Sequence, residues 1–272
     1  MSIIYCMHTQ SDCYKAASKI VPTGIVVHST GSNNTSIARY SQPSDNDPNR
    51  TKLLNLIGVN KYGNSWNKSG VSKAVHYIIG KLADGTVATV YNIPENYACW
   101  GCGKGSKGSY NYAPVGRIQF EVCEDDLNGK DYFKAIFKEA TELCADICHR
   151  YGWSASAIAS HKEAHAQGYA SNHGDIDHWL SWHNKTMNDF RAEVQRLLDE
   201  MNAPKEPEAP SFEPYGAHSM ASPYVIYNDE GNRIGQIDEG VPITVTDEKT
   251  VGETVLCKIE GWMPKEFLRK DK

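Results

Sequence analysis

The chain has 272 residues, of which 40% are hydrophobic and 22% charged, and its net charge at pH 7 is −5. This length and apolar content suffice for one large domain or for two smaller ones, each with its own core. The negative charge, without any basic stripe interleaved with aromatic residues, argues against nucleic acid as a partner.

The first twenty residues lack a basic start followed by a long apolar run, so they do not predict a signal peptide. No stretch of the sequence predicts a membrane span. We therefore expect a protein made in the cytoplasm, which acts elsewhere only after release or non-standard export. Of its eight cysteines, Cys99 and Cys102 form a lone CxxC pair, which is weak evidence for structural zinc. We expect mostly reduced thiols.

Residues 24–30 form a short β-branched run that predicts a buried strand with His28 near its end. Taken alone, His28 is explained equally well as a hydrogen-bonded core histidine. The polar residues that follow, including Asn33 and Asn34, suit the wall of a polar cleft.

The middle of the chain predicts a long loop region over residues 41–69, with a short helix around residues 53–57. Two runs at residues 74–79 and 86–91 then flank an Asp-Gly turn and predict a hairpin. Residues 101–109 are rich in glycine, serine and lysine but lack the spacing of a phosphate-binding loop, so we expect a flexible cleft wall.

Residues 117–122 alternate as a strand does, and Glu121 shares a face with Gln119 rather than with the apolar residues. Glu121 is thus available as a catalytic carboxylate, although a solvent-facing strand glutamate is the commoner alternative. Residues 131–151 show apolar side chains at helical spacing, ended by Gly152, and predict a helix that packs on the core.

Residues 160–179 hold four of the ten histidines and two aspartates. Such side chains are the usual ligands of a catalytic zinc ion. His161 and His165 would share a helical face, but Glu163 lies midway between them, unlike the glutamate of metalloprotease helices. We expect only one ligand from this pair, and beyond Ala166 the stretch predicts a loop. A polar surface loop is the alternative for the whole stretch.

Four motifs in order resemble a known family: IVVHST at residues 25–30, VHYIIGKLADGTV at 75–87, IQFEV at 118–122, and SHKEAH followed by HGD at 160–175. Over residues 22–183 the chain resembles the zinc-dependent N-acetylmuramoyl-L-alanine amidases of the type-2 family, which are related to peptidoglycan-recognition proteins. The resemblance implies an α/β fold in which helices flank a mixed central β-sheet, with the metal at the strand ends.

The resemblance implies one Zn2+ ion held by His28, His161 and Asp175. Ile176 stands where the family has proline, and this leaves Asp177 as a rival for the third ligand. Two histidines and one carboxylate leave zinc a position for water, whose pKa falls toward about 7 when it is bound.

The resemblance also assigns two catalytic residues. Glu121 would act as general base and then as proton donor to the leaving amine. His173 would donate a hydrogen bond to the oxyanion of the tetrahedral intermediate. His165 and His178 are expected in supporting or surface positions.

The implied substrate is bacterial peptidoglycan, cut at the amide between N-acetylmuramic acid and L-alanine of the stem peptide. Family members often have a histidine where this chain has Gly101, so one substrate contact is missing. The candidates for substrate binding are Asn33, Asn34, His76 and Asn172.

After a predicted helix at residues 186–201, proline and glutamate dominate residues 202–214, which predict an extended linker. Short strands at 224–227, 233–237, 242–246 and 255–259 predict a small all-β barrel. The tail at residues 260–268 resembles the end of bacterial SH3-like domains. We therefore expect a zinc amidase domain at 1–201, the linker at 202–214 and an SH3-like cell-wall-binding domain at 215–272.

Two functions follow from these patterns. The first is a peptidoglycan hydrolase, expected to be a phage or prophage endolysin because no signal peptide is visible. The second is a non-catalytic peptidoglycan-binding protein on the same fold, since receptors of this superfamily can lose the third zinc ligand. The presence of two histidines, an aspartate and Glu121 favours the enzyme.

Overall fold

The computed structural model describes residues 3–203, 214–218, 224–227, 232–251 and 254–260. Backbone contacts divide the chain into two compact units, Met1–Ala203 and Pro204–Lys272.

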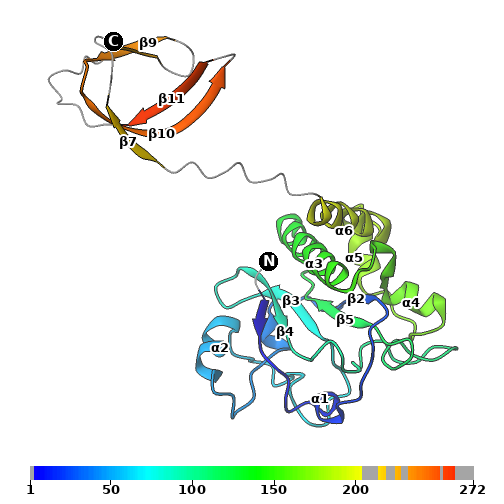
Figure 1. The fold of residues 1–272 in the computed structure, drawn as a ribbon. Coiled ribbons are helices and arrows are strands. Elements are labelled where there is room, and N and C mark those ends of the chain that lie inside the picture. The colour runs from blue at the N-terminus through cyan, green and yellow to red at the C-terminus, as the bar shows by residue number, and fades with distance from the viewer. Residues whose placement is uncertain (1–2, 204–213, 219–223, 228–231, 252–253, 261–272) are drawn as a thin grey trace. The chain divides into compact units, whose positions relative to one another are not determined.

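The first unit is built on a six-stranded mixed sheet with the order β1-β4-β3-β5-β2-β6 (Figure 1). The strands are β1 (Ile3–Tyr5), β2 (Ile25–Ser29), β3 (Tyr77–Lys81), β4 (Val87–Tyr91), β5 (Ile118–Val122) and β6 (Ile158–Ser160). Strands β3, β5, β2 and β6 run parallel to one another, whereas β4 is antiparallel to β3. The predicted mixed sheet and hairpin are therefore confirmed.

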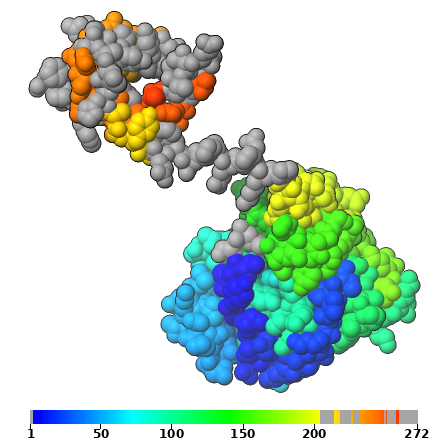
Figure 2. Space-filling view, in the orientation of Figure 1, coloured from blue at the N-terminus to red at the C-terminus, as the bar shows by residue number. Residues whose placement is uncertain are grey.

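Two long helices cover one face of the sheet. They are α3 (Lys130–Tyr151) and α6 (Met187–Asn202), which pack against each other and are seen side by side, in green and yellow, in Figures 1 and 2. Both were predicted from helical spacing. The shorter helices are α1 (Asp12–Ala16), α2 (Arg50–Ile57), α4 (His161–Gln167) and α5 (Ile176–Trp182), with 3-10 turns η1 (Ile37–Arg39) and η2 (Ala155–Ala157). No helix in the described ranges is long and apolar enough to cross a membrane.

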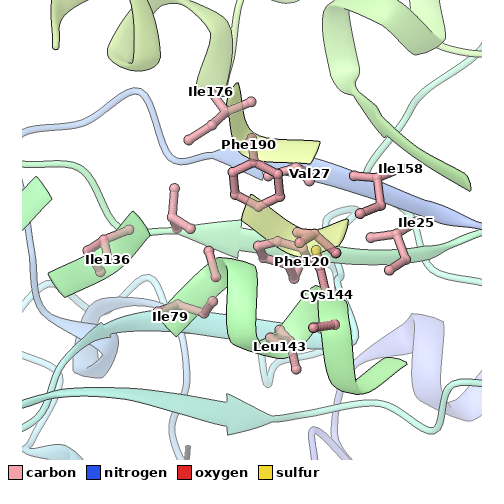
Figure 3. Close-up of a cluster of buried hydrophobic side chains, with 14 of the residues drawn as sticks. Ile25, Val27, Ile79, Phe120, Ile136, Leu143, Cys144, Ile158, Ile176 and Phe190 are labelled. Carbon is pink, nitrogen blue, oxygen red and sulfur yellow. The ribbon is translucent and has the colours of Figure 1, made fainter. Parts of the chain in front are cut away.

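The alternation of side chains along each strand separates the core from His28 and Glu121. Side chains at alternate positions, among them Val27, Phe120 and Ile158, point toward α3 and α6 and are buried there (Figure 3). Burying each such side chain contributes about 1.5–3 kcal/mol. Because neighbouring residues of a strand face opposite sides, His28 and Glu121 lie on the face that these two helices do not cover.

Helix α5 corrects the prediction of a loop beyond Ala166. The segment from Ile176 to Trp182 contains no glycine or proline, and its buried side chains, Ile176, Trp179 and Leu180, have the spacing i, i+3, i+4. The two glycines and the polar residues just before it made the whole stretch resemble a loop.

The second unit contains β7 (Tyr215–His218), β8 (Tyr224–Tyr227), β9 (Arg233–Ile237), β10 (Pro242–Val251) and β11 (Thr254–Glu260). Strands β11, β10 and β7 form one antiparallel sheet, and β8 pairs with β9. Strands lie at the four predicted positions, although β10 is longer than expected. The SH3-like barrel stays a prediction, because most of the linker and of the C-terminal motif lies outside the described residues.

The partly buried carboxylate of Glu95 ties the sheet to α3. Arg150 donates two hydrogen bonds, of 2.7 and 2.8 Å, to the two oxygens of Glu95, and the hydroxyl of Tyr77 donates a third of 2.6 Å. Burial acts to raise the pKa of Glu95, but the hydrogen bonds from Arg150 and Tyr77 outweigh it, so the pKa lies below its usual range.

We expect Glu95→Gln to lower the free energy of unfolding at pH 7 by about 1–3 kcal/mol, since the hydrogen bonds from Arg150 and Tyr77 lose their charged acceptor. A depressed folded-state pKa gives stability that is present above the unfolded pKa and lost as the pH falls through the folded value. Urea unfolding from pH 7 to pH 3 should therefore show the difference between wild type and variant shrinking with falling pH.

The matched control is Glu193→Gln, which breaks an exposed pair with Arg196 within α6. It should change the free energy of unfolding by less than about 0.5 kcal/mol. Equal effects of the two substitutions would contradict a structural role for the Glu95 carboxylate.

Candidate metal centre

The parallel strands deliver two histidines to one edge of the sheet. His28 is the fourth residue of β2, and His161 directly follows β6, the neighbour of β2. On the other side of β2, Glu121 of β5 is the direct partner of His28 in the parallel register. The carboxyl ends of parallel strands are where α/β folds usually place their binding sites.

The position of His161 is fixed by the start of helix α4. Ser160 and Glu163 form a capping box, in which each side chain accepts a hydrogen bond from the backbone of the other, at 3.1 and 3.0 Å. Arg191 of α6 donates to both oxygens of Glu163 at 2.8 and 2.9 Å. Glu163 thus anchors the helix start and does not turn toward the histidines.

Asp175 reaches the two histidines from an unusual backbone conformation. It occupies the N-cap position of α5 with φ 38° and ψ −131°, a region that costs a non-glycine residue of order 1–3 kcal/mol. An aspartate at this position usually accepts a hydrogen bond from the first helical turn, but Asp175 makes none. Its carboxylate turns to the histidines instead.

One oxygen of Asp175 and one nitrogen of each histidine converge on a single point. Oδ2 of Asp175 lies 2.9 Å from Nδ1 of His28 and 2.7 Å from Nδ1 of His161, and the two nitrogens are 2.9 Å apart. Both histidines are almost fully buried, at 1% and 3% exposure. Within the described part of the chain, this is the one group of three metal-ligating side chains whose ligand atoms converge.

Hydrogen atoms cannot satisfy all three contacts. If both Nδ1 atoms carry a hydrogen, both can donate to Asp175, but the two N–H groups then face each other without an acceptor. If either lacks its hydrogen, a lone pair faces the carboxylate. A metal cation accepts an electron pair from all three atoms at once, and two imidazoles with one carboxylate are a donor set that zinc takes.

The charges around the three atoms also favour a cation. Burial lowers the pKa of His28, so its ring is neutral. For Asp175 burial acts upward, but the contacts with His161 and His28 prevail and lower the pKa, so the group is a carboxylate. Burial, followed by the charges of Asp175 and Glu124, raises the pKa of Glu121. The site therefore concentrates acidic groups that a divalent ion would neutralise.

The two predicted catalytic residues lie next to these three atoms. Among the described residues, none hydrogen-bonds Oε2 of Glu121, although this oxygen is buried. His173 is 62% exposed in its side chain, and its Nδ1 lies 3.8 Å from Oδ1 of Asp175. Its ring centre is 5.0 Å from that of His161.

The predicted substrate contacts are placed differently. Asn33 and Asn172 are exposed, whereas the side chain of Asn34 accepts a hydrogen bond from the backbone of Ser36 and stabilises its own loop. His76 is fully buried: Nδ1 accepts from the backbone of Gln119 at 2.9 Å, and Nε2 donates to the carbonyl of Tyr97 at 2.9 Å. The predicted contact of His76 with substrate therefore has no support in the structure.

The other members of the histidine-rich stretch are engaged elsewhere. His165 contacts the carbonyl of Ala170 at 3.0 Å through Nδ1, and His178 contacts Glu124 at 3.1 Å through Nε2. Asp177 does not join the group of three, and burial raises its pKa.

Sequence reasoning did not identify the residues behind the histidines. The sulfur of Cys102 lies 3.8 Å from Nε2 of His28 and 3.3 Å from Oε1 of Gln119, and the hydroxyl of Ser171 lies 3.4 Å from Nε2 of His161. The shared strand face of Gln119 and Glu121 was the available signal. The glycine-rich segment predicted to be flexible is instead tied to residues 168–171 by backbone hydrogen bonds, including Ser171 N–H to the Cys102 carbonyl at 2.8 Å.

The sequence of the chain matches a known family. The sequence model of the family described as N-acetylmuramoyl-L-alanine amidase, Amidase_2, matches residues 18–178, which is more than half of the chain. A comparison with curated protein sequences gave no match.

Several solved structures resemble the chain. One is the Staphylococcus aureus hydrolase AmiA in complex with its ligand, at 15% identity over 74% of this chain and 85% of that chain, with a TM-score of 0.47. A second is PlyL, at 15% identity over 72% of this chain and 97% of that chain, with a TM-score of 0.43. A third is the catalytic domain of XlyA, at 17% identity over 71% of this chain and 99% of that chain, with a TM-score of 0.45.

We expect Asp175→Ala to weaken zinc binding by more than about 100-fold, because removing a direct ligand should cost more than the 10- to 100-fold typical of residues behind the ligands. Zinc-to-protein ratios after dialysis against a competing chelator would measure this. Asp177→Ala is the matched control and should retain zinc as wild type does. The reverse pattern would make Asp177 the third ligand.

Proposed function

Since the chain belongs to the N-acetylmuramoyl-L-alanine amidase family, we propose that it is a zinc-dependent peptidoglycan hydrolase that cuts the amide between N-acetylmuramic acid and L-alanine of the stem peptide. The main support is the convergence of His28, His161 and Asp175, whose three contacts hydrogen atoms cannot satisfy together.

In this proposal His28, His161 and Asp175 hold the Zn2+ ion. When bound, the ion supplies a Lewis acid that lowers the pKa of a water molecule and polarises the amide carbonyl. The protein contributes two almost fully buried imidazoles and a partly buried carboxylate, whose ligand atoms already converge.

Glu121 has the properties of a proton carrier. Its oxygen Oε2 is buried and has no hydrogen-bond partner among the described residues, so it is free to accept a proton from the attacking water. Burial raises the pKa of Glu121, which increases its affinity for that proton. The same oxygen then gives the proton to the leaving amine nitrogen, which departs as the free amino group of L-alanine.

His173 is proposed to stabilise the negative charge that develops on the carbonyl oxygen. Its exposed ring beside Asp175 can turn an N–H toward the substrate. Losing such a donor typically lowers turnover about 10²- to 10³-fold. Asn33, Asn34 and Asn172 stay proposed substrate contacts, and the endolysin role and cell-wall binding by residues 215–272 also stay proposals.

The proposed hydrolase activity can be tested on purified cell walls, with and without a chelator. We expect the wild type to release new L-alanine amino termini, and chelation to abolish the release until zinc is restored. Binding to the walls without chelator-sensitive release would overturn the hydrolase and favour the non-catalytic peptidoglycan-binding protein. Release of reducing sugar ends instead would show that a different bond is cut.

Glu121→Gln keeps the size of the side chain but removes the proton acceptor. We expect the rate of amide cleavage to fall by about 10²- to 10⁴-fold. Zinc content should stay within twofold of wild type, because Glu121 is not a proposed ligand. A variant that keeps its activity would show that another group takes the proton.

A further inference from the structure

The side chain of Gln119 is fully buried in β5, on the same face as His28. Its amide nitrogen faces acceptors only: the carbonyls of Cys99 and Tyr110, at 3.2 and 3.4 Å, and Oδ1 of Asn111 at 3.1 Å. Because an amide nitrogen only donates, these three contacts fix the orientation of the amide. Its oxygen Oε1 must then face the opposite side.

That oxygen faces Cys102, whose thiol donates to it at 3.3 Å and whose sulfur lies 3.8 Å from Nε2 of His28. Because the thiol hydrogen points to Gln119, the sulfur is left to accept a hydrogen from the ring. Nε2 of His28 therefore carries the hydrogen, and Gln119 acts on His28 through Cys102. A neutral imidazole has a single N–H hydrogen. Nδ1 of His28 therefore presents a bare electron pair to the convergence point.

Ser171 plays the corresponding part for His161. Its hydroxyl lies 3.3 Å from the carbonyl of Cys102 and 3.4 Å from Nε2 of His161. The carbonyl only accepts, so the hydroxyl hydrogen points to Cys102, and the hydroxyl oxygen is left to accept the hydrogen of His161. Nδ1 of His161 is then bare as well.

Both contacts depend on the peptide groups of Cys102. The backbone N–H of Cys102 donates to Oδ1 of Asn111 at 2.9 Å, and its carbonyl accepts from the backbone N–H of Ser171 at 2.8 Å. Asn111 in turn accepts from Gln119. One continuous hydrogen-bonded chain thus links the far sides of the two histidine rings.

We propose that Gln119 and Ser171 are positioning residues, which hold His28 and His161 in the tautomer with hydrogen on Nε2 and so present both Nδ1 atoms to the metal. The proposal rests on the proposed function, because the cation is the zinc ion of that site. The proposal goes beyond that function by naming the side chains that determine which nitrogen of each histidine faces the ion. In this proposal the two side chains contact neither the ion nor the substrate.

Gly101 provides a second, independent observation. A Cβ atom at this position would overlap Oε1 of Gln119 and lie 3.3 Å from Nε2 of His28. The missing side chain at residue 101 therefore makes the room that the Gln119 amide occupies. A side chain there would have to displace Gln119, whose amide hydrogens are shared among three buried acceptors.

The first test compares Gln119→Leu and Ser171→Ala with wild type. We expect zinc dissociation constants to rise about 10- to 100-fold, as is typical when a partner of a ligating histidine is lost. Thr89→Val, which removes another buried hydroxyl from the same sheet, is the matched control and should leave the constant within twofold. Unchanged zinc affinity in Gln119→Leu would overturn the proposal.

A second readout does not depend on activity. Ring-nitrogen NMR of the zinc-loaded wild type should show a slowly exchanging hydrogen on Nε2 of both histidines. The His28 hydrogen should exchange faster in Gln119→Leu, and the His161 hydrogen should exchange faster in Ser171→Ala. Hydrogens on Nδ1, or exchange rates that neither variant changes, would contradict the assignment.

A double-mutant cycle isolates the role of Gly101. Gly101→Ala alone should weaken zinc binding at least about 10-fold, because it displaces Gln119. In a Gln119→Ala background the same substitution should weaken zinc binding by less than about threefold, since the overlapping oxygen is gone. Equal losses of zinc affinity in both backgrounds would contradict the role proposed for Gly101. A wild type that binds no zinc would instead refute the proposed function, and metal-free spectra would then still report the tautomers.

Discussion

Oδ2 of Asp175 and the Nδ1 atoms of His28 and His161 meet at distances of 2.7–2.9 Å in this protein, and hydrogen atoms cannot satisfy all three contacts at once. The chain brings them from three places: the end of β2, the first residue of α4 and the N-cap of α5. None of these segments could form the site alone. The site therefore exists only when the sheet is assembled and both short helices are docked on it.

The two faces of the sheet have different tasks. The face under α3 and α6 is apolar and close-packed, and it contributes the stability of the unit. The opposite face near the strand ends holds polar groups that weaken a fold when they lack partners, including buried oxygens of Glu121 and Glu124 without hydrogen bonds among the described residues. The strained backbone of Asp175 belongs to the same side. Stability gained on one face thus offsets the cost of the site on the other.

Much of the fold could be predicted from local patterns. Strand alternation, the Asp-Gly turn and helical spacing located β2, β3, β4, β5, α3 and α6, because the regular alternation of apolar and polar residues determines which face is buried. His28, His161 and Asp175, which the structure brings together, also stand in marked positions: a strand end, the start of a histidine-rich stretch and a motif shared with a family.

The rest depended on contacts that no local pattern contains. His76 looks like a cleft residue in sequence, yet the strand pairing of its neighbours buries it and occupies both nitrogens. The role of Gln119 follows from three acceptors contributed by the segment of residues 99–111, and the glycine at 101 is explained only by the amide that fills its space. The departure from the family pattern at this residue thus has a physical reason.

The ion pair between Arg191 and Glu163 makes helix α6 part of the structural unit that positions His161. The family match stops at residue 178, but the capping box that holds His161 is clamped from α6, beyond that limit. Phe190 and Val194 of the same helix also fill the core beneath the sheet. The segment that the family model matches is therefore shorter than the unit whose contacts position His161, and a fragment trimmed to residues 18–178 would lose the support of that ligand while keeping all three ligands.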